Sequence, residues 1–182
     1  LILGHRLSEW CGHGPILEED IATANVALDF IGQAASILRL AGEVEAKGRD
    51  EDALAYFRDG VYFRNCLMVE QPNGDFGFTM MRSFLFDAYS VLVWEALAKC
   101  GHEQLAAIAA KSLKEDKYHL RHSSEWVVRL GDGTEESHAR MQRALDALWR
   151  YTAELFERDG VDDAVAALGV DVDLAGIKSR WD

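Results

Sequence analysis

The chain has 182 residues, a length that suits one well-buried core and is short for two ordinary domains. Hydrophobic residues make up 49% of it and charged residues 27%, proportions that are normal for a globular protein and exclude extensive disorder. The formal net charge of −12 argues against a nucleic-acid partner, because phosphate backbones are bound by clustered Lys and Arg.

The first predicted helix begins near Ile21, after Pro15, and ends at Gly42. Its apolar residues recur in alternating steps of three and four, which places them on one face of a helix. We expect this face to pack against neighbouring helices. Its members are Ile21, Ala24, Leu28, Ile31, Ala35 and Leu38.

A second helix is predicted to begin after Asp50 and to end before residues 70–75. It would carry Leu54, Phe57 and Val61 on its apolar face. Pro, Asn and Gly occur together in 70–75, a composition typical of a turn.

Three further helices follow in the same rhythm. The third spans roughly 78–99 and ends at Gly101, and the fourth spans about 103–130. Thr134 is typical of an N-cap for a fifth helix, which we expect to end near 159–160. The apolar positions are Met81, Phe84, Ala88, Val91, Glu95 and Ala98 in the third helix, and Met141, Leu145, Leu148, Thr152 and Leu155 in the fifth.

No strand pattern and no internal repeat occur, and the residues after 160 indicate short helices and loops. The sequence therefore predicts an all-α antiparallel helical bundle. Residues 1–182 would form a single domain.

The fourth helix contains the residues most capable of chemistry. Steps of three and four place seven residues on one helix face: Leu105, Ile108, Ser112, Glu115, His119, His122 and Trp126. If this face is the buried one, an acid and two imidazoles point into the interior. A competing stripe of Leu113, Leu120 and Val127 would turn these polar groups toward a flank, and periodicity alone does not choose. If they are buried, they form either a metal site or a mutually satisfied polar network.

The acid-x-x-His spacing of Asp116 and His119 is half of the signature of a diiron bundle, which needs two such pairs and two lone carboxylates. No histidine occurs between His13 and His102, so the intervening helices cannot supply the second pair. We therefore favour the polar network. Other helices offer four carboxylates as possible ligands: Asp20, Asp29, Asp87 and Glu95. Acids at such positions are more often helix caps or ion-pair partners, here of Arg58, Arg64 and Arg82.

Other catalytic templates fail. Ser123 and Ser124 adjoin His122 on a helix, but sequence neighbours point in different directions and cannot pair as nucleophile and base. No glycine-rich phosphate loop occurs. The many aromatic residues of 56–94 could line a substrate pocket, although core or subunit-interface roles fit them better.

Cysteine content and segment composition bear on location. Cys11, Cys66 and Cys100 are odd in number and widely separated, which favours buried reduced thiols over disulfides or a zinc site. No run of about 18 apolar residues stands out, so no membrane span is expected. We expect a cytoplasmic protein and, because the chain starts at Leu1 without flanks of a signal peptide, a fragment lacking the ends of a longer chain.

Several blocks of sequence occur in a recognisable order along nearly the whole chain. The blocks are RLSEWCGHGP at 6–15, EEDIA at 18–22, ANVALDFIGQA at 24–34, VEQPNGDF at 69–76, KE at 114–115, YHLR at 118–121, RLGDGT at 129–134 and LWRYTAELF at 148–156. Together they resemble the C-subunit family of the bacterial phenylacetyl-CoA epoxidases.

This resemblance implies a multicomponent oxygenase of phenylacetate catabolism. Its catalytic A subunit is a ferritin-like diiron protein that epoxidises the ring of phenylacetyl-CoA with O2 and electrons from a reductase. The C subunit is a related bundle without metal that pairs with the A subunit. For this chain we expect a ferritin-like bundle with no catalytic residue and no cofactor of its own, in a hetero-oligomer with the A subunit and other epoxidase subunits.

Five residues mark what would be the vestige of a metal site: Asp87, Glu115, Asp116, His119 and His122. The resemblance includes Glu115 and His119, so the acid-x-x-His spacing of Asp116 is interpreted as coincidental. The alternative is an independent ferritin-like oxidoreductase that binds metal through Glu115, His119 and His122.

Overall fold

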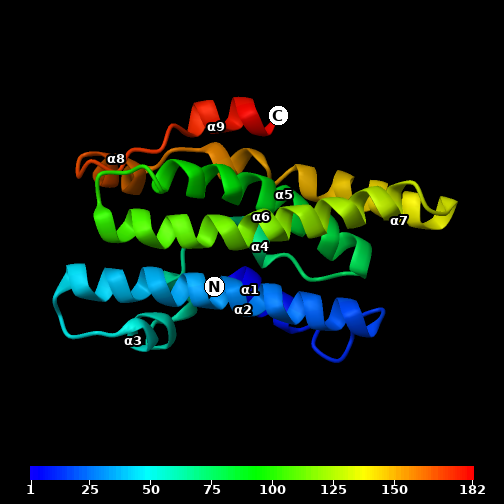
Figure 1. The fold of residues 1–182 in the computed structure, drawn as a ribbon, viewed down its shortest axis with the longest axis horizontal. Coiled ribbons are helices and arrows are strands. Elements are labelled where there is room, and N and C mark those ends of the chain that lie inside the picture. Colours follow the sequence, from blue (N-terminus) through cyan, green and yellow to red (C-terminus); the bar gives the residue numbers. More distant parts are fainter. The chain divides into compact units, whose positions relative to one another are not determined.

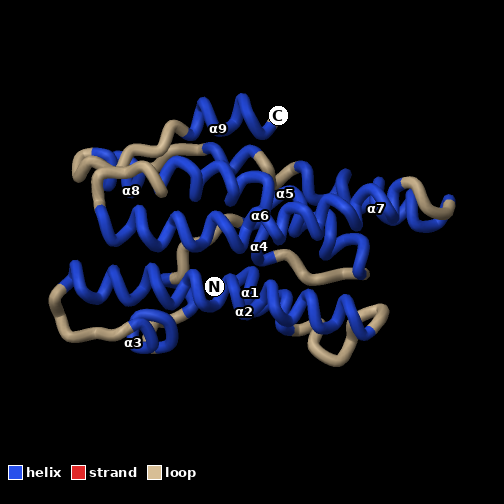
Figure 2. Tube along the Cα trace, viewed as in Figure 1, coloured by secondary structure: helices blue, strands red, loops and turns tan.

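The computed structural model describes residues 1–182 and contains helices and loops but no strand (Figures 1 and 2). The predicted all-α class is therefore confirmed. The chain divides into two compact units, Leu1–Asn65 and Cys66–Asp182, and each is described by itself. That residues 1–182 form one domain stays a prediction.

In the first unit, a short helix that the sequence analysis missed, α1 (Ile2–Ser8), packs on the long helix α2 (Leu17–Glu45) and buries Leu3 and Leu7. The connecting loop is fixed by Asp20, whose carboxylate accepts hydrogen bonds from the backbone N–H of Gly12 at 3.1 Å and of Gly14 at 3.0 Å. These bonds to the charged form lower the pKa of Asp20. Asp20 is thus a structural acid.

The buried face of α2 differs from the predicted one. Ile21 and Leu28, members of the predicted stripe, are exposed. The helix also continues past Gly42 to Glu45, and its C-cap Ala46 has a left-handed conformation with φ of 55°. The prediction was wrong because α2 carries small and apolar residues on several faces, so more than one stripe fits its sequence. The buried residues are Thr23, Val26, Ala27, Phe30, Gln33 and Gly42.

The second predicted helix is three short elements. Asp50 caps the first, α3 (Glu51–Tyr56), by accepting the backbone N–H of Ala53 at 2.8 Å. A 3₁₀ turn, η1 (Gly60–Tyr62), and α4 (Leu67–Glu70), which belongs to the second unit, follow. Phe57 and Val61 are exposed, so no continuous apolar face holds one helix together.

The second unit is built on three long helices, α5 (Phe76–Leu97), α6 (Glu103–Gly131) and α7 (Glu135–Trp149). Short connections make α5 and α6, and then α6 and α7, antiparallel neighbours, and all three are in mutual contact (Figure 1). The shorter elements are η2 (Ala153–Phe156), α8 (Gly160–Ala166) and α9 (Leu174–Trp181).

The bounds of α5 and α6 lie within two residues of the predicted ones, and Thr134 is the N-cap of α7 as predicted. The fifth predicted helix was too long, because α7 ends at Trp149. Of the predicted stripe of α5, only Met81 and Val91 are buried. The core of this unit is formed by Met68, Met81, Leu85, Met141, Ala144, Leu148 and Leu155.

Two findings bear on the composition. By length and composition alone, α2 could cross a membrane, but a core helix of a soluble protein passes the same test, so this is weak evidence.

The three cysteines are free, yet Cys11 is exposed rather than buried. Cys66 is half-buried, and burial raises the pKa of its thiol to about 11, which keeps it protonated.

Candidate functional site

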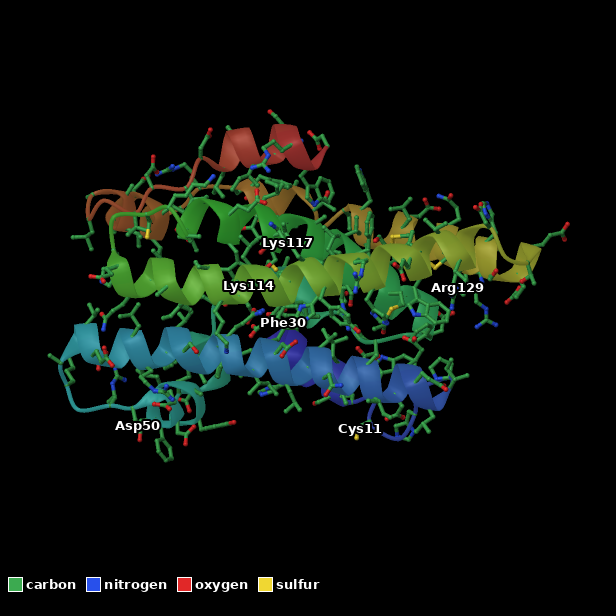
Figure 3. The ribbon with its side chains drawn as sticks, viewed as in Figure 1. Cys11, Phe30, Asp50, Lys114, Lys117 and Arg129 are labelled. Atoms are coloured by element: carbon green, nitrogen blue, oxygen red, sulfur yellow. The ribbon has the colours of Figure 1, made fainter.

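Polar side chains, not apolar ones, form the buried face of α6. Lys114 and Lys117, labelled in Figure 3, lie on its exposed face. The buried residues of α6 are Ala109, Ser112, Asp116, His119 and Ser123. The last four are spaced by four, three and four, which places them on one helix face. This polar spacing was the sequence signal for the face. The first predicted stripe includes Ser112 and His119 but not Asp116 and Ser123, and the competing stripe includes none of the four.

Helix α5 supplies the other half of the polar cluster. Ser90 donates a hydrogen bond to Oδ2 of Asp116, and Nε1 of Trp94 donates to the same oxygen at 3.0 Å. The second oxygen, Oδ1, lies 3.4 Å from Nδ1 of His119. Asp116 is fully buried, and it joins α5 to α6 through Oδ2 while Oδ1 faces the imidazole.

A second carboxylate, Asp87 of α5, is also buried. Ser123 donates a hydrogen bond to its Oδ2 at 2.8 Å, whereas Oδ1 has no hydrogen-bond partner. Burial, with a smaller contribution from the charge of Asp116, raises the pKa of Asp87 to about 7, while His119 and Ser123 oppose the shift. Near neutral pH, Asp87 is therefore poised between its neutral and ionised forms.

The polar cluster is thus Asp87, Ser90 and Trp94 of α5 with Asp116, His119 and Ser123 of α6. It does not include the predicted acid Glu115, which is partly exposed and pairs with Lys111 at 3.3 Å. Asp116 is instead the acid that lies beside His119 in this cluster. That its acid-x-x-His spacing is not a revived metal site stays a prediction. Glu115 and Asp116 precede His119 by four and three residues and so flank it on opposite sides of the helix. The side of Asp116 packs against α5, whereas that of Glu115 stays partly exposed.

His122 lies outside the cluster. Its ring stacks on that of Tyr118, with ring centroids 6.4 Å apart and planes 13° from parallel. Asp20 and Glu95, considered as further metal ligands, have other roles. Asp20 holds the loop before α2, and Glu95 pairs with Arg180 and Lys117, which lower its pKa.

These donors do not fit a diiron centre. Such a centre needs four carboxylates and two imidazoles, whereas the cluster offers two carboxylates and one imidazole. Asp116 already accepts two hydrogen bonds on one oxygen. No group of three or more His, Cys, Asp or Glu side chains in residues 1–182 is placed to hold a metal ion.

A cavity elsewhere in the second unit is too small for a large substrate. It lies where α5 begins, α6 ends and α7 begins, and its volume is about 160 Å³. Sites for drug-sized ligands span about 300–1,000 Å³. Its wall includes Asp75, Gly77, Leu130, Arg140 and Met141. Arg140 is held there by Asp75 at 3.2 Å and Glu136 at 2.7 Å, so its charge is already compensated.

The structure defines an all-α protein in which two antiparallel helices enclose a cluster of carboxylate, imidazole and hydroxyl groups. The family model described as phenylacetic acid catabolic protein matches residues 1–182, and the chain belongs to this family. It is 48% identical over 182 residues to the C subunit of 1,2-phenylacetyl-CoA epoxidase from Escherichia coli (strain K12). The match covers 100% of this chain and 73% of that protein.

Proposed function

We propose that this chain is a non-catalytic subunit of a 1,2-phenylacetyl-CoA epoxidase and acts in phenylacetate catabolism by holding a catalytic subunit that carries the diiron centre. The observation that carries the proposal is the match along all of residues 1–182 to the C subunit of such an enzyme. A subunit implies partners, which for this chain are the catalytic subunit and the other epoxidase subunits. A cytoplasmic location is part of the same proposal.

The polar cluster supports a structural role. Asp116 ties α5 to α6 through bonds with Ser90 and Trp94, and Ser123 ties the same helices through Asp87. Buried hydrogen-bond networks of this kind fix the register of the elements they join. We infer that the chain folds as a ferritin-like bundle whose central polar positions fasten helices together instead of binding iron.

The rival proposal, an independent oxidoreductase using Glu115, His119 and His122, has weaker support. Glu115 is engaged by Lys111 and His122 by the ring of Tyr118, while His119 faces Asp116. These three residues therefore have three different surroundings.

Reconstitution tests the proposal. The catalytic subunit and the reductase, with and without this chain, would be assayed for O2-dependent epoxidation of phenylacetyl-CoA. We expect activity only when the chain is present, and we expect the chain to copurify with the catalytic subunit. Full activity without the chain, or failure to copurify, would refute the proposal. The same assay would also include the Asp116→Asn variant of this chain. If the Asp116 carboxylate is structural, epoxidase activity should fall only in proportion to the loss of folded complex.

A further inference from the structure

Helix α2 packs against both α1 and α3 within its own unit, yet part of its apolar surface stays exposed. The buried face, with Val26, Phe30 (labelled in Figure 3) and Gln33, includes the side that packs against α1. A second row of apolar residues follows a strict heptad around the side of the helix, and within this row Ile31 lies against α1 beside Gly4. We call this row the α2 seam: Leu17, Ile21, Ala24, Leu28, Ile31, Ala35 and Leu38.

The α2 seam alternates steps of four and three over three heptads, the spacing of the a and d positions in a coiled coil. Leu17, Ile21 and Leu28 are 72%, 54% and 65% exposed, and the other members are half-buried. In an ordinary coiled coil the f positions face solvent and the seam is buried. In α2 the residues at the f positions, Val26 and Gln33, are buried, whereas Leu17, Ile21 and Leu28 of the seam are exposed. This distribution of exposed and buried positions is the reverse of that in a coiled coil.

We propose that the α2 seam is the surface on which a helix of the catalytic epoxidase subunit packs. This inference rests on the proposed function and names the surface that the proposed pairing uses. The heptad points to a helical occupant, because knobs-into-holes packing needs a facing helix with a matching seam. The small residues Ala24 and Ala35 let that helix approach closely.

Interface size favours a folded subunit over a single peptide helix. A stable interface uses about 20–30 residues on each side. The seam supplies seven, so its occupant must make additional contacts beside it. A helix carried by a folded partner meets this requirement.

Charge favours a different chain over a second copy of this one. Each copy carries a formal charge of −12, so two copies repel each other. Glu18 and Asp20 border the N-terminal end of the seam, and Asp20 is engaged by the loop before α2. The occupant is therefore a helix with an apolar seam that carries Lys or Arg opposite Glu18.

The test uses the full-length chain and the catalytic subunit, with their Kd measured by sedimentation. Leu28→Glu places a charge in the middle of the α2 seam. Val44→Glu is the matched control, because Val44 is 71% exposed on the same helix but lies outside the seam. We expect Leu28→Glu to raise the Kd at least about 30-fold, which corresponds to the loss of one hot spot of about 2 kcal/mol. Val44→Glu should leave the Kd unchanged.

Each outcome has one meaning. Equal binding by wild type and Leu28→Glu would overturn the seam as the docking surface while leaving the proposed function intact. Failure of the wild-type chain to bind the catalytic subunit would refute the proposed function itself. A self-associating chain that Leu28→Glu makes monomeric, with unchanged binding to the catalytic subunit, would assign the seam to a second copy and overturn the proposed occupant.

Folding is controlled separately. Both positions are exposed, so the helical circular dichroism and Tm of each variant should equal those of wild type. Ile21→Gln is a second seam variant without a new charge. If both Ile21→Gln and Leu28→Glu bind the catalytic subunit more weakly and keep a normal Tm, the α2 seam is supported as the docking surface. If Ile21→Gln binds normally and Leu28→Glu has a lowered Tm, the α2 seam is refuted as the docking surface.

Discussion

Oδ2 of Asp116 on α6 accepts hydrogen bonds from both Ser90 and Trp94 on α5, so a single buried oxygen joins two helices at two points. The neighbouring acid in the sequence, Glu115, is partly exposed and makes an ion pair with Lys111. The two residues are adjacent, yet they should differ greatly in their importance for stability.

The pair Asp116→Ala and Glu115→Ala measures this difference. Removing the Asp116 carboxylate leaves the buried donors of Ser90 and Trp94 without their acceptor, and we expect a loss of about 2–4 kcal/mol in the free energy of unfolding. Glu115→Ala should change it by less than about 0.5 kcal/mol, as for a typical surface pair. Urea unfolding followed by circular dichroism gives both values. Equal losses would contradict the assigned positions of the two acids.

Asp87 makes stability depend on pH. Its pKa is about 7 in the folded chain and near 3.8 when unfolded, so between these values the folded state retains a proton that the unfolded state has released. The contribution of Asp87 to stability is therefore fully present below pH 3.8, falls as pH rises toward 7, and then stays constant. The slope from this group is at most about 1.4 kcal/mol per pH unit.

Asp87→Asn should remove this slope, because an amide does not titrate. The difference in unfolding free energy between wild type and the variant, measured in urea from about pH 4 to 8, should change in favour of the variant as pH rises. Asp146→Asn, at an exposed acid of α7, is the control and should track wild type. A constant difference between wild type and Asp87→Asn across this range would show that Asp87 is ionised throughout.

The start of α7 is fixed by a capping box. Oγ1 of Thr134 accepts the backbone N–H of Ser137 at 3.1 Å, and the Ser137 hydroxyl accepts the backbone N–H of Thr134 at 2.9 Å. Thr134→Ala should cost about 1 kcal/mol, and Thr134→Ser should restore most of it. Thermal unfolding compares the three proteins. A Thr134→Ser variant as unstable as Thr134→Ala would mean that the hydroxyl is not the stabilising group.

The helix bounds that were predictable have strong local signals. Gly101 lies just before α6, and Thr134 is the N-cap of α7 and is followed by two acids. These helix ends are therefore determined by a few neighbouring residues. The buried faces were harder. On α2, both the α2 seam and the face of Val26 and Phe30 are apolar, and no local rule ranks two apolar faces.

The face of α6 was predicted only in part, for the opposite reason. It is lined by Ser112, Asp116, His119 and Ser123, so a search for apolar periodicity passes over it. What buries these groups is pairing with Ser90, Trp94 and Asp87, which lie at least 22 residues away along the chain. Such pairing depends on how two helices dock and is not written in either helix alone. Of the two acids that precede His119, Asp116 is buried beside it and Glu115 stays partly exposed.

The central claim is that this chain holds a diiron subunit without binding iron itself. Elemental analysis of the chain purified alone from iron-supplemented cultures, beside the chain purified with the catalytic subunit, tests it most directly. We predict iron near zero in the chain alone and about two irons per catalytic subunit in the complex. One or two irons per chain in the isolated protein would contradict the account, and loss of that iron in His119→Ala would identify the polar cluster as a metal site.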